Sequence, residues 1–264
     1  MRILLACLAL LLASIPGHAE MVVNSVDYTL GDTTFAGQLV YDNDSKALRP
    51  GLVMVPNWMG VNESALGKAK DIAGRDYVVL LADMYGKGVR PKNVDEARAQ
   101  VHQVYADLPA MRARINAAVD ALKAQAGKVP LQSGKVGALG FCFGGSTVLE
   151  LARSGTELAG VVSLHGGLDT PAPAAADSVK TSILVLNGAE DRGTTAENIA
   201  AFDAEMDAAG ADWTFVNFSG AVHCFAEADA NRPPGCVYNE RAAKAAWRMM
   251  RGFFSEAFAA PAKG

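Results

Sequence analysis

The sequence predicts an α/β protein whose mostly parallel sheet is covered by helices on both faces. Short apolar segments alternate along most of the chain with longer segments of helical periodicity, the pattern of parallel strands joined by crossover helices. An antiparallel pair precedes this alternation, at 21–30 and 33–41, with a turn at Gly31-Asp32. Internal repeats, low-complexity tracts and strong domain boundaries are absent from the sequence. We therefore expect one domain over residues 20–264.

The remaining elements follow from apolar runs and from Gly and Pro. Apolar runs predict buried strands at 51–56, 77–81, 135–139, 159–164, 182–186 and 212–218. Helical periodicity predicts helices at 65–73, 94–126 with an interruption near Pro109, 146–153, 196–209 and 240–258. Loops are expected at 42–50, 57–62, 86–93 and 170–176. In such sheets ligands bind beyond the carboxyl ends of the strands, so functional residues are sought there.

Residues 1–19 have the composition of a signal peptide. Arg2 precedes an apolar run at 3–15, and the segment ends in small residues at Ala19. The run is too short to span a bilayer comfortably, so we expect cleavage after Ala19 and a periplasmic or secreted protein. The whole chain of 264 residues has a net charge of −4 and lacks a basic cluster, which argues against nucleic acid or membrane partners. We expect a monomer or a small homo-oligomer.

Cys142 lies in a glycine-rich segment between a predicted strand and a predicted helix, Gly140-Phe141-Cys142-Phe143-Gly144-Gly145. A sharp turn there exposes the thiol above the sheet, and the helix N-terminus behind it favours a thiolate and an oxyanion. The spacing is that of a G-x-S-x-G elbow with Cys as nucleophile. Two other interpretations are a structural turn with a buried Cys, and a dinucleotide-binding loop, although that loop normally follows the first strand.

Three residues with the chemistry of a catalytic triad follow strand ends in chain order: Cys142, Asp191 and His223. Alone, an Asp there is often a helix cap and a His is often structural. Nucleophile, acid and histidine in this order are typical of an α/β-hydrolase. Cys142 would attack a carbonyl carbon, His223 would transfer protons and Asp191 would orient the imidazole. We expect the backbone N–H groups of Phe143 and Trp58 to form the oxyanion hole.

These motifs resemble those of the dienelactone hydrolase family of α/β-hydrolases, over about Val26 to Phe254. The resemblance rests on the segment around Cys142 and on segments 188–191, 220–225, 55–62 and 82–86. It implies hydrolysis of esters or lactones by a Cys–Asp–His triad without a cofactor. Paired Cys or His spacing typical of a metal site is missing from the sequence.

Two departures from the family pattern affect the expected substrate. The best-studied members have Glu where this chain has Asn57, and Arg, which binds a substrate carboxylate, where it has Glu227. We therefore expect neutral rather than anionic substrates, because Glu227 repels an anion. Candidate pocket residues are Asn57, Met59, Tyr85, Phe225 and Glu227, although the apolar members, like Trp58 and Phe143, could equally be core. Asp83 and His165 are interpreted as structural.

The cysteines predict one disulfide and one free thiol. Without the signal segment three remain, an odd number, and an oxidising compartment favours pairing. A bridge at Cys142 would consume the nucleophile, so we expect the pair Cys224–Cys236; the alternative is two unpaired cysteines. Two non-hydrolase classes also stay open: a binding protein on the same fold, and a thiol redox protein, which would lack a neighbouring resolving Cys.

Overall fold

The alternating pattern at the start of the chain forms the expected antiparallel pair. The structure, a computed structural model, describes residues 21–259, so the predicted signal peptide lies outside the described residues. β1 (Met21–Leu30) pairs with β2 (Thr33–Asp42), and Gly31 provides the positive φ of 56° that their turn requires. Among residues 21–259, no helix is both long and apolar enough to cross a membrane.

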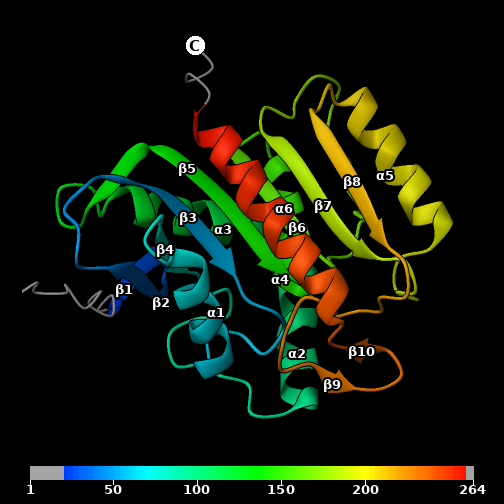
Figure 1. The fold of residues 1–264 in the computed structure, drawn as a ribbon, viewed down its shortest axis with the longest axis horizontal. Helices are drawn as coiled ribbons and strands as arrows, with labels where there is room; N and C mark the ends of the chain where they lie inside the picture. Colours follow the sequence, from blue (N-terminus) through cyan, green and yellow to red (C-terminus); the bar gives the residue numbers. More distant parts are fainter. Residues whose placement is uncertain (1–20, 260–264) are drawn as a thin grey trace, which may run out of the picture.

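A sheet of eight strands forms the centre of the molecule, in the order β1-β2-β4-β3-β5-β6-β7-β8. Its other members are β3 (Arg49–Val55), β4 (Val78–Leu81), β5 (Leu131–Phe141), β6 (Gly160–Leu164), β7 (Ser182–Gly188) and β8 (Trp213–Phe218). From β4 to β8 all neighbouring strands are parallel, while β2 runs antiparallel to β4. The carboxyl ends of the parallel strands therefore meet at one edge (Figure 1).

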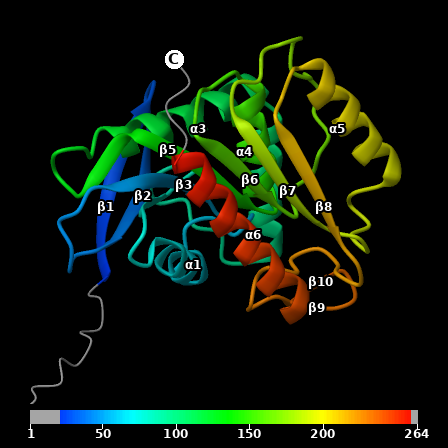
Figure 2. The ribbon, with the colours of Figure 1, turned by 45° about the horizontal axis from the view of Figure 1, so that its top comes forward.

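Helices cover both faces of this sheet and enclose two apolar cores. Side chains of α1 (Glu63–Ala73) and α6 (Glu240–Ala259) belong to one core. Those of α3 (Leu108–Lys123), α4 (Phe143–Arg153) and α5 (Ala196–Ala208) belong to the other. Figure 2 shows α1 and α6 on the same side of the sheet. Along β3, Leu52 and Met54 pack into the first core and Val53 and Val55 into the second, as the alternation of a strand requires.

The structure moves several predicted boundaries. The long helical region is interrupted near Pro109, as predicted, and forms α2 (Val94–Tyr105) and α3, which ends at Lys123 rather than at Ala126. The Asp107 side chain accepts the Ala110 N–H and so starts α3. β3 begins at Arg49, inside a predicted loop, and α4 begins at Phe143 rather than at Ser146. After His223 the chain forms a short hairpin, β9 (Asn231–Arg232) and β10 (Cys236–Val237), in a segment for which no element was predicted.

Candidate active site

Cys142 occupies a strained turn between β5 and α4. Its φ is 55°, an unfavourable value for a residue with a side chain. Its N–H donates to the Leu164 carbonyl oxygen at 3.0 Å, which ties the turn to β6. The flanking glycines make room: a Cβ on Gly140 would lie 2.0 Å from the Gly144 carbonyl oxygen, and one on Gly144 2.2 Å from that of Val55. The sharp turn predicted from the glycine spacing is thus present.

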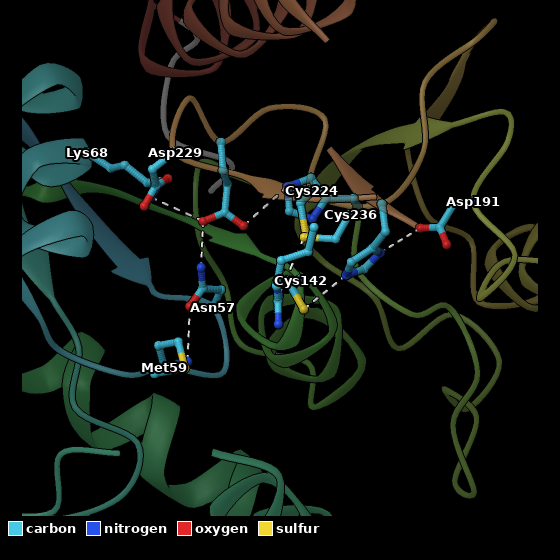
Figure 3. Close-up of a disulfide and its surroundings, with 12 residues drawn as sticks. Asn57, Met59, Lys68, Cys142, Asp191, Cys224, Asp229 and Cys236 are labelled. Carbon is cyan, nitrogen blue, oxygen red and sulfur yellow. Dashed lines mark hydrogen bonds and ion pairs between the residues drawn. A yellow bond between two sulfur atoms is a disulfide. The ribbon is translucent and has the colours of Figure 1, made fainter. Parts of the chain in front are cut away.

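The turn brings Cys142 to the two other predicted triad residues, which follow β7 and β8. Figure 3 shows Cys142 and Asp191 at this site. His223 Nε2 lies 3.1 Å from Cys142 Sγ, and His223 Nδ1 lies 2.6 Å from Asp191 Oδ2. The other carboxylate oxygen of Asp191 accepts the Gly193 N–H at 2.8 Å. This is the geometry of a nucleophile bonded to a base that an acid orients.

Electrostatics favour a charged imidazolium at this site. Burial opposes ionisation of His223, but hydrogen bonds with Asp191 and Cys142 and the negative charges of both raise its pKa to about 10. Burial also opposes ionisation of Asp191, yet hydrogen bonds from His223 and Gly193 and the charge of His223 lower the Asp191 pKa below its ordinary value. The arrangement therefore suits a thiolate–imidazolium pair supported by a carboxylate.

The oxyanion hole predicted from the sequence consists of two backbone N–H groups. The Phe143 N–H is the first of α4, so it has no acceptor within its own helix. The loop after β3, which carries Trp58, is held by two bonds: Tyr85 Oη donates to the Trp58 carbonyl oxygen at 2.7 Å, and the Met59 N–H donates to Asn57 Oδ1 at 3.0 Å. No hydrogen bond within residues 21–259 uses the Trp58 N–H. Neither N–H group predicted for the oxyanion hole has a hydrogen-bond acceptor within the described part of the chain.

A cavity of about 290 Å³ opens beside the thiol. It is lined by Cys142 and by Asn57, Trp58, Met59, Cys224, Glu227, Asp229, Ala230, Asn231, Arg232 and Cys236. The prediction of Tyr85 and Phe225 as pocket residues is not supported. Tyr85 stacks beneath the loop on Phe143, with ring centroids 5.7 Å apart, and Phe225 is fully buried against Phe218 in the core. Each ring therefore packs against other aromatic side chains and is not part of the cavity lining.

Glu227 lines the cavity as predicted, but it is not the isolated charge that the sequence suggested. Its side chain is 3% exposed, and Oε2 accepts the Asn57 amide at 2.6 Å and lies 3.2 Å from Lys68 Nζ. Burial raises the Glu227 pKa, while the charge of Lys68 and the hydrogen bonds from Lys68 and Asn57 oppose that rise. Sequence reasoning missed Lys68, because the predicted helix gave no sign that one of its lysines reaches the end of the sheet.

His165 lies directly behind the catalytic candidates. It is fully buried, and its ring packs edge-on against His223, with centroids 5.1 Å apart. Burial and then the charge of His223 keep the His165 pKa well below its ordinary value, so the ring is neutral. A neutral ring here lets His223 hold the positive charge without a competing cation. This agrees with the structural interpretation of His165.

A disulfide joins Cys224 to Cys236 and leaves Cys142 free. The bridge links the residue after His223 to β10, and the hairpin places the Arg232 guanidinium 5.3 Å from the centroid of the Trp58 ring. It therefore ties the wall of the cavity to the loop that carries the histidine. Within residues 21–259, no group of three or more His, Cys, Asp or Glu side chains could hold a metal ion.

Comparisons with known proteins point to one family. A sequence profile of the dienelactone hydrolase family matches residues 35–258. The chain is similar to the crystal structure of a "dienelactone hydrolase-like promiscuous phosphotriesterase P91" from metagenomic libraries, with 35% identity and a TM-score of 0.85 over 91% of this chain and 100% of that one. It is also similar to the structure "m3DLH", with 34% identity and a TM-score of 0.84 over 90% and 99% of the two chains. "Uncharacterized protein K02A2.1" of Caenorhabditis elegans is 34% identical over 155 residues, 56% of this chain and 95% of that protein.

Proposed function

The chain belongs to the dienelactone hydrolase family of carboxylic ester hydrolases, and on this premise we propose that it hydrolyses esters or lactones with Cys142 as nucleophile, His223 as base and Asp191 as orienting acid. The observation that carries the proposal is the continuous chain of contacts from Sγ through the imidazole to the carboxylate, at 3.1 Å and 2.6 Å. Hydrogen bonds of this length are needed for proton transfer between side chains.

In the first half-reaction the Cys142 thiolate attacks the carbonyl carbon of the substrate. The carbonyl electrons move onto oxygen, where the N–H groups of Phe143 and Trp58 stabilise the negative charge. The tetrahedral intermediate then collapses and its bond to the alcohol oxygen breaks. His223 gives its Nε2 proton to that oxygen, which leaves an acyl thioester and a neutral imidazole.

The second half-reaction reverses these roles with water. Neutral His223 accepts a proton from water as the water oxygen attacks the thioester carbon. The new tetrahedral intermediate expels the thiolate, and the carboxylic acid product leaves. Asp191 keeps the same Nδ1–H bond to His223 in both halves, so the Nε2 atom always faces the reacting groups.

We propose neutral substrates and an exported enzyme. Glu227 and Asp229 bring two carboxylates to the cavity. Arg232 in the lining and Lys68 behind the wall balance these two charges, so the surroundings suit an uncharged ligand. Export is supported by the composition of residues 1–19 and by the Cys224–Cys236 disulfide, since disulfides persist in oxidising compartments. Fractionation of cells expressing the full chain tests export: the processed protein should be in the periplasm or the medium.

Replacement of Cys142 tests the mechanism. Cys142→Ala should abolish turnover of 4-nitrophenyl acetate, a loss of several orders of magnitude in kcat, with an unchanged circular dichroism spectrum. Mass spectrometry of wild-type protein quenched during turnover should find the acyl group on Cys142. Full activity of Cys142→Ala would exclude the triad. An inactive wild type would instead favour a binding protein, or, if it exchanged disulfides, a thiol redox protein.

A second candidate activity is phosphotriester hydrolysis. It is favoured by the similarity to the promiscuous phosphotriesterase P91, because the matched region spans 100% of that chain. The same thiolate could attack phosphorus and expel an aryl oxide, with the two backbone N–H groups facing the phosphoryl oxygen. Hydrolysis of paraoxon by the wild type and its loss in Cys142→Ala would establish this activity. Ester turnover without paraoxon turnover would exclude it.

A further inference from the structure

The two carboxylate oxygens of Glu227 differ in their hydrogen bonds: Oε2 has donors within the protein and Oε1 has none. Oε2 receives the Asn57 amide and faces the Lys68 ammonium, at 2.6 Å and 3.2 Å. Oε1 accepts no hydrogen bond from any residue between 21 and 259. The nearest candidate, His165 Nε2, is 3.9 Å away, too far for a hydrogen bond. A structural role for Glu227 thus explains Oε2 but leaves Oε1 unused.

Oε1 is not one of the sealed, unpartnered atoms of the protein interior. It is an open acceptor, and a donor on a bound ligand would add a charge-assisted hydrogen bond there. Glu227 is 3% exposed and lines the same cavity as Cys142. A ligand in that cavity can therefore supply the missing donor. The neighbouring carboxylate, Asp229, differs: Oδ1 faces Lys68 at 3.0 Å and Oδ2 accepts from Ser64 Oγ at 2.5 Å, so both of its oxygens are in use.

We propose, on the basis of the function proposed above, that Glu227 Oε1 accepts a hydrogen bond from a hydroxyl group on the acyl part of the substrate. The enzyme then prefers small hydroxyacyl esters, or the matching hydroxylactones, over their deoxy analogues. The cavity, about 290 Å³, is at the small end of ligand pockets, so the hydroxyl lies within a few bonds of the reacting carbonyl. Lys68 already balances the carboxylate charge, which makes a neutral hydroxyl a better match than an ammonium group.

A series of 4-nitrophenyl esters with one leaving group tests the proposal on the wild-type protein. The acyl groups are butyryl, 3-hydroxybutyryl, 3-methoxybutyryl and 3-aminobutyryl, and each kcat/KM is divided by the rate of hydroxide-catalysed hydrolysis of the same ester. We expect the hydroxy ester to exceed the butyryl ester by about 10- to 100-fold, the range for a hydrogen bond to a charged group. The methoxy ester can only accept a hydrogen bond and should show no gain.

Two variants assign the preference to Glu227. Glu227→Gln, nearly isosteric, should lower the hydroxy-to-butyryl ratio at least several-fold while 4-nitrophenyl butyrate is still hydrolysed. Asp229→Asn, which changes the other cavity carboxylate, should leave the ratio unchanged. The proposal is overturned if the hydroxyl gives the wild type no gain, if the methoxy ester gains equally, if the amino ester gains more, or if the ratio follows Asp229. Each of these outcomes leaves ester hydrolysis by Cys142 intact, whereas a failure of that function removes all turnover.

Discussion

Removal of the Cys224–Cys236 bridge should lower both stability and activity, and the size of the stability loss follows from the loop that the bridge closes. The two residues are 12 apart in sequence, and for a loop of this length the chain-entropy model gives about 3 kcal/mol. Other restraints survive: the Val237 N–H donates to the His223 carbonyl oxygen at 3.2 Å and the Asn239 N–H to that of Phe225 at 3.1 Å. We therefore expect a folded variant whose histidine is less well held, with kcat reduced by up to about 100-fold.

The measurement compares wild type with Cys224→Ala/Cys236→Ala by urea unfolding and by 4-nitrophenyl acetate turnover. Wild type treated with a thiol reductant is the matched control, because it loses the bridge without losing either side chain. Both should unfold at lower urea concentration by similar amounts. A double variant whose free energy of unfolding lies within about 0.5 kcal/mol of the wild-type value would refute the reasoning. The bridge would then add no stability beyond that of the surviving hydrogen bonds.

Three further predictions concern the turn and the triad. Gly140→Ala should lower the free energy of unfolding by about 3 kcal/mol or more, because its Cβ would lie 2.0 Å from a backbone oxygen. The control Gly134→Ala, with open space around it, should change that free energy by less than about 1 kcal/mol. Equal effects of the two substitutions in urea unfolding would contradict the packing argument. Asp191→Asn should lower kcat by about 10⁴-fold with little change in KM, because the imidazole loses its orienting acceptor; a KM-only effect would contradict that role. The His223 pKa, about 10, exceeds the ordinary value near 6.5, so the stability that this group contributes is complete below pH 6.5 and declines as pH rises toward 10. The difference in free energy of unfolding between wild type and His223→Gln should therefore shrink from pH 6.5 to pH 10. A difference that grows over this range would contradict a raised His223 pKa.

Much of the fold could be predicted because local signals and tertiary structure agree. The apolar run before Gly140 forms β5, and the runs that end at Leu164 and Leu186 lie in β6 and β7. The three triad candidates meet because each follows a parallel strand, and those strands end at one edge. That convergence is a property of the architecture, so the chain order of Cys142, Asp191 and His223 was sufficient to predict it.

The rest depended on contacts that local sequence does not encode. Lys68 and Glu227 are far apart in the chain, and their pairing depends on where α1 crosses the end of the sheet. Tyr85 and Phe225 are aromatic residues of the kind that line pockets. Whether such a ring lies in the cavity or in the core is decided by its packing partners, which the local sequence does not show. The β9–β10 hairpin has two residues per strand and follows Phe225 in a polar segment, so it leaves almost no period-2 signal.

The triad is assembled from three strand ends that are widely separated in sequence: Cys142 and His223 are 81 residues apart, and Asp191 and His223 are 32 apart. Turnover therefore reports on completion of the whole carboxyl-terminal half of the sheet. A folding intermediate with β5 and α4 in place but β8 undocked would carry a thiol without a base. In a refolding experiment, fast alkylation of Cys142, which requires the thiolate that His223 stabilises, should thus appear only with activity and after most of the circular dichroism signal has returned. The interval between that signal and activity would measure how long the last strands take to dock.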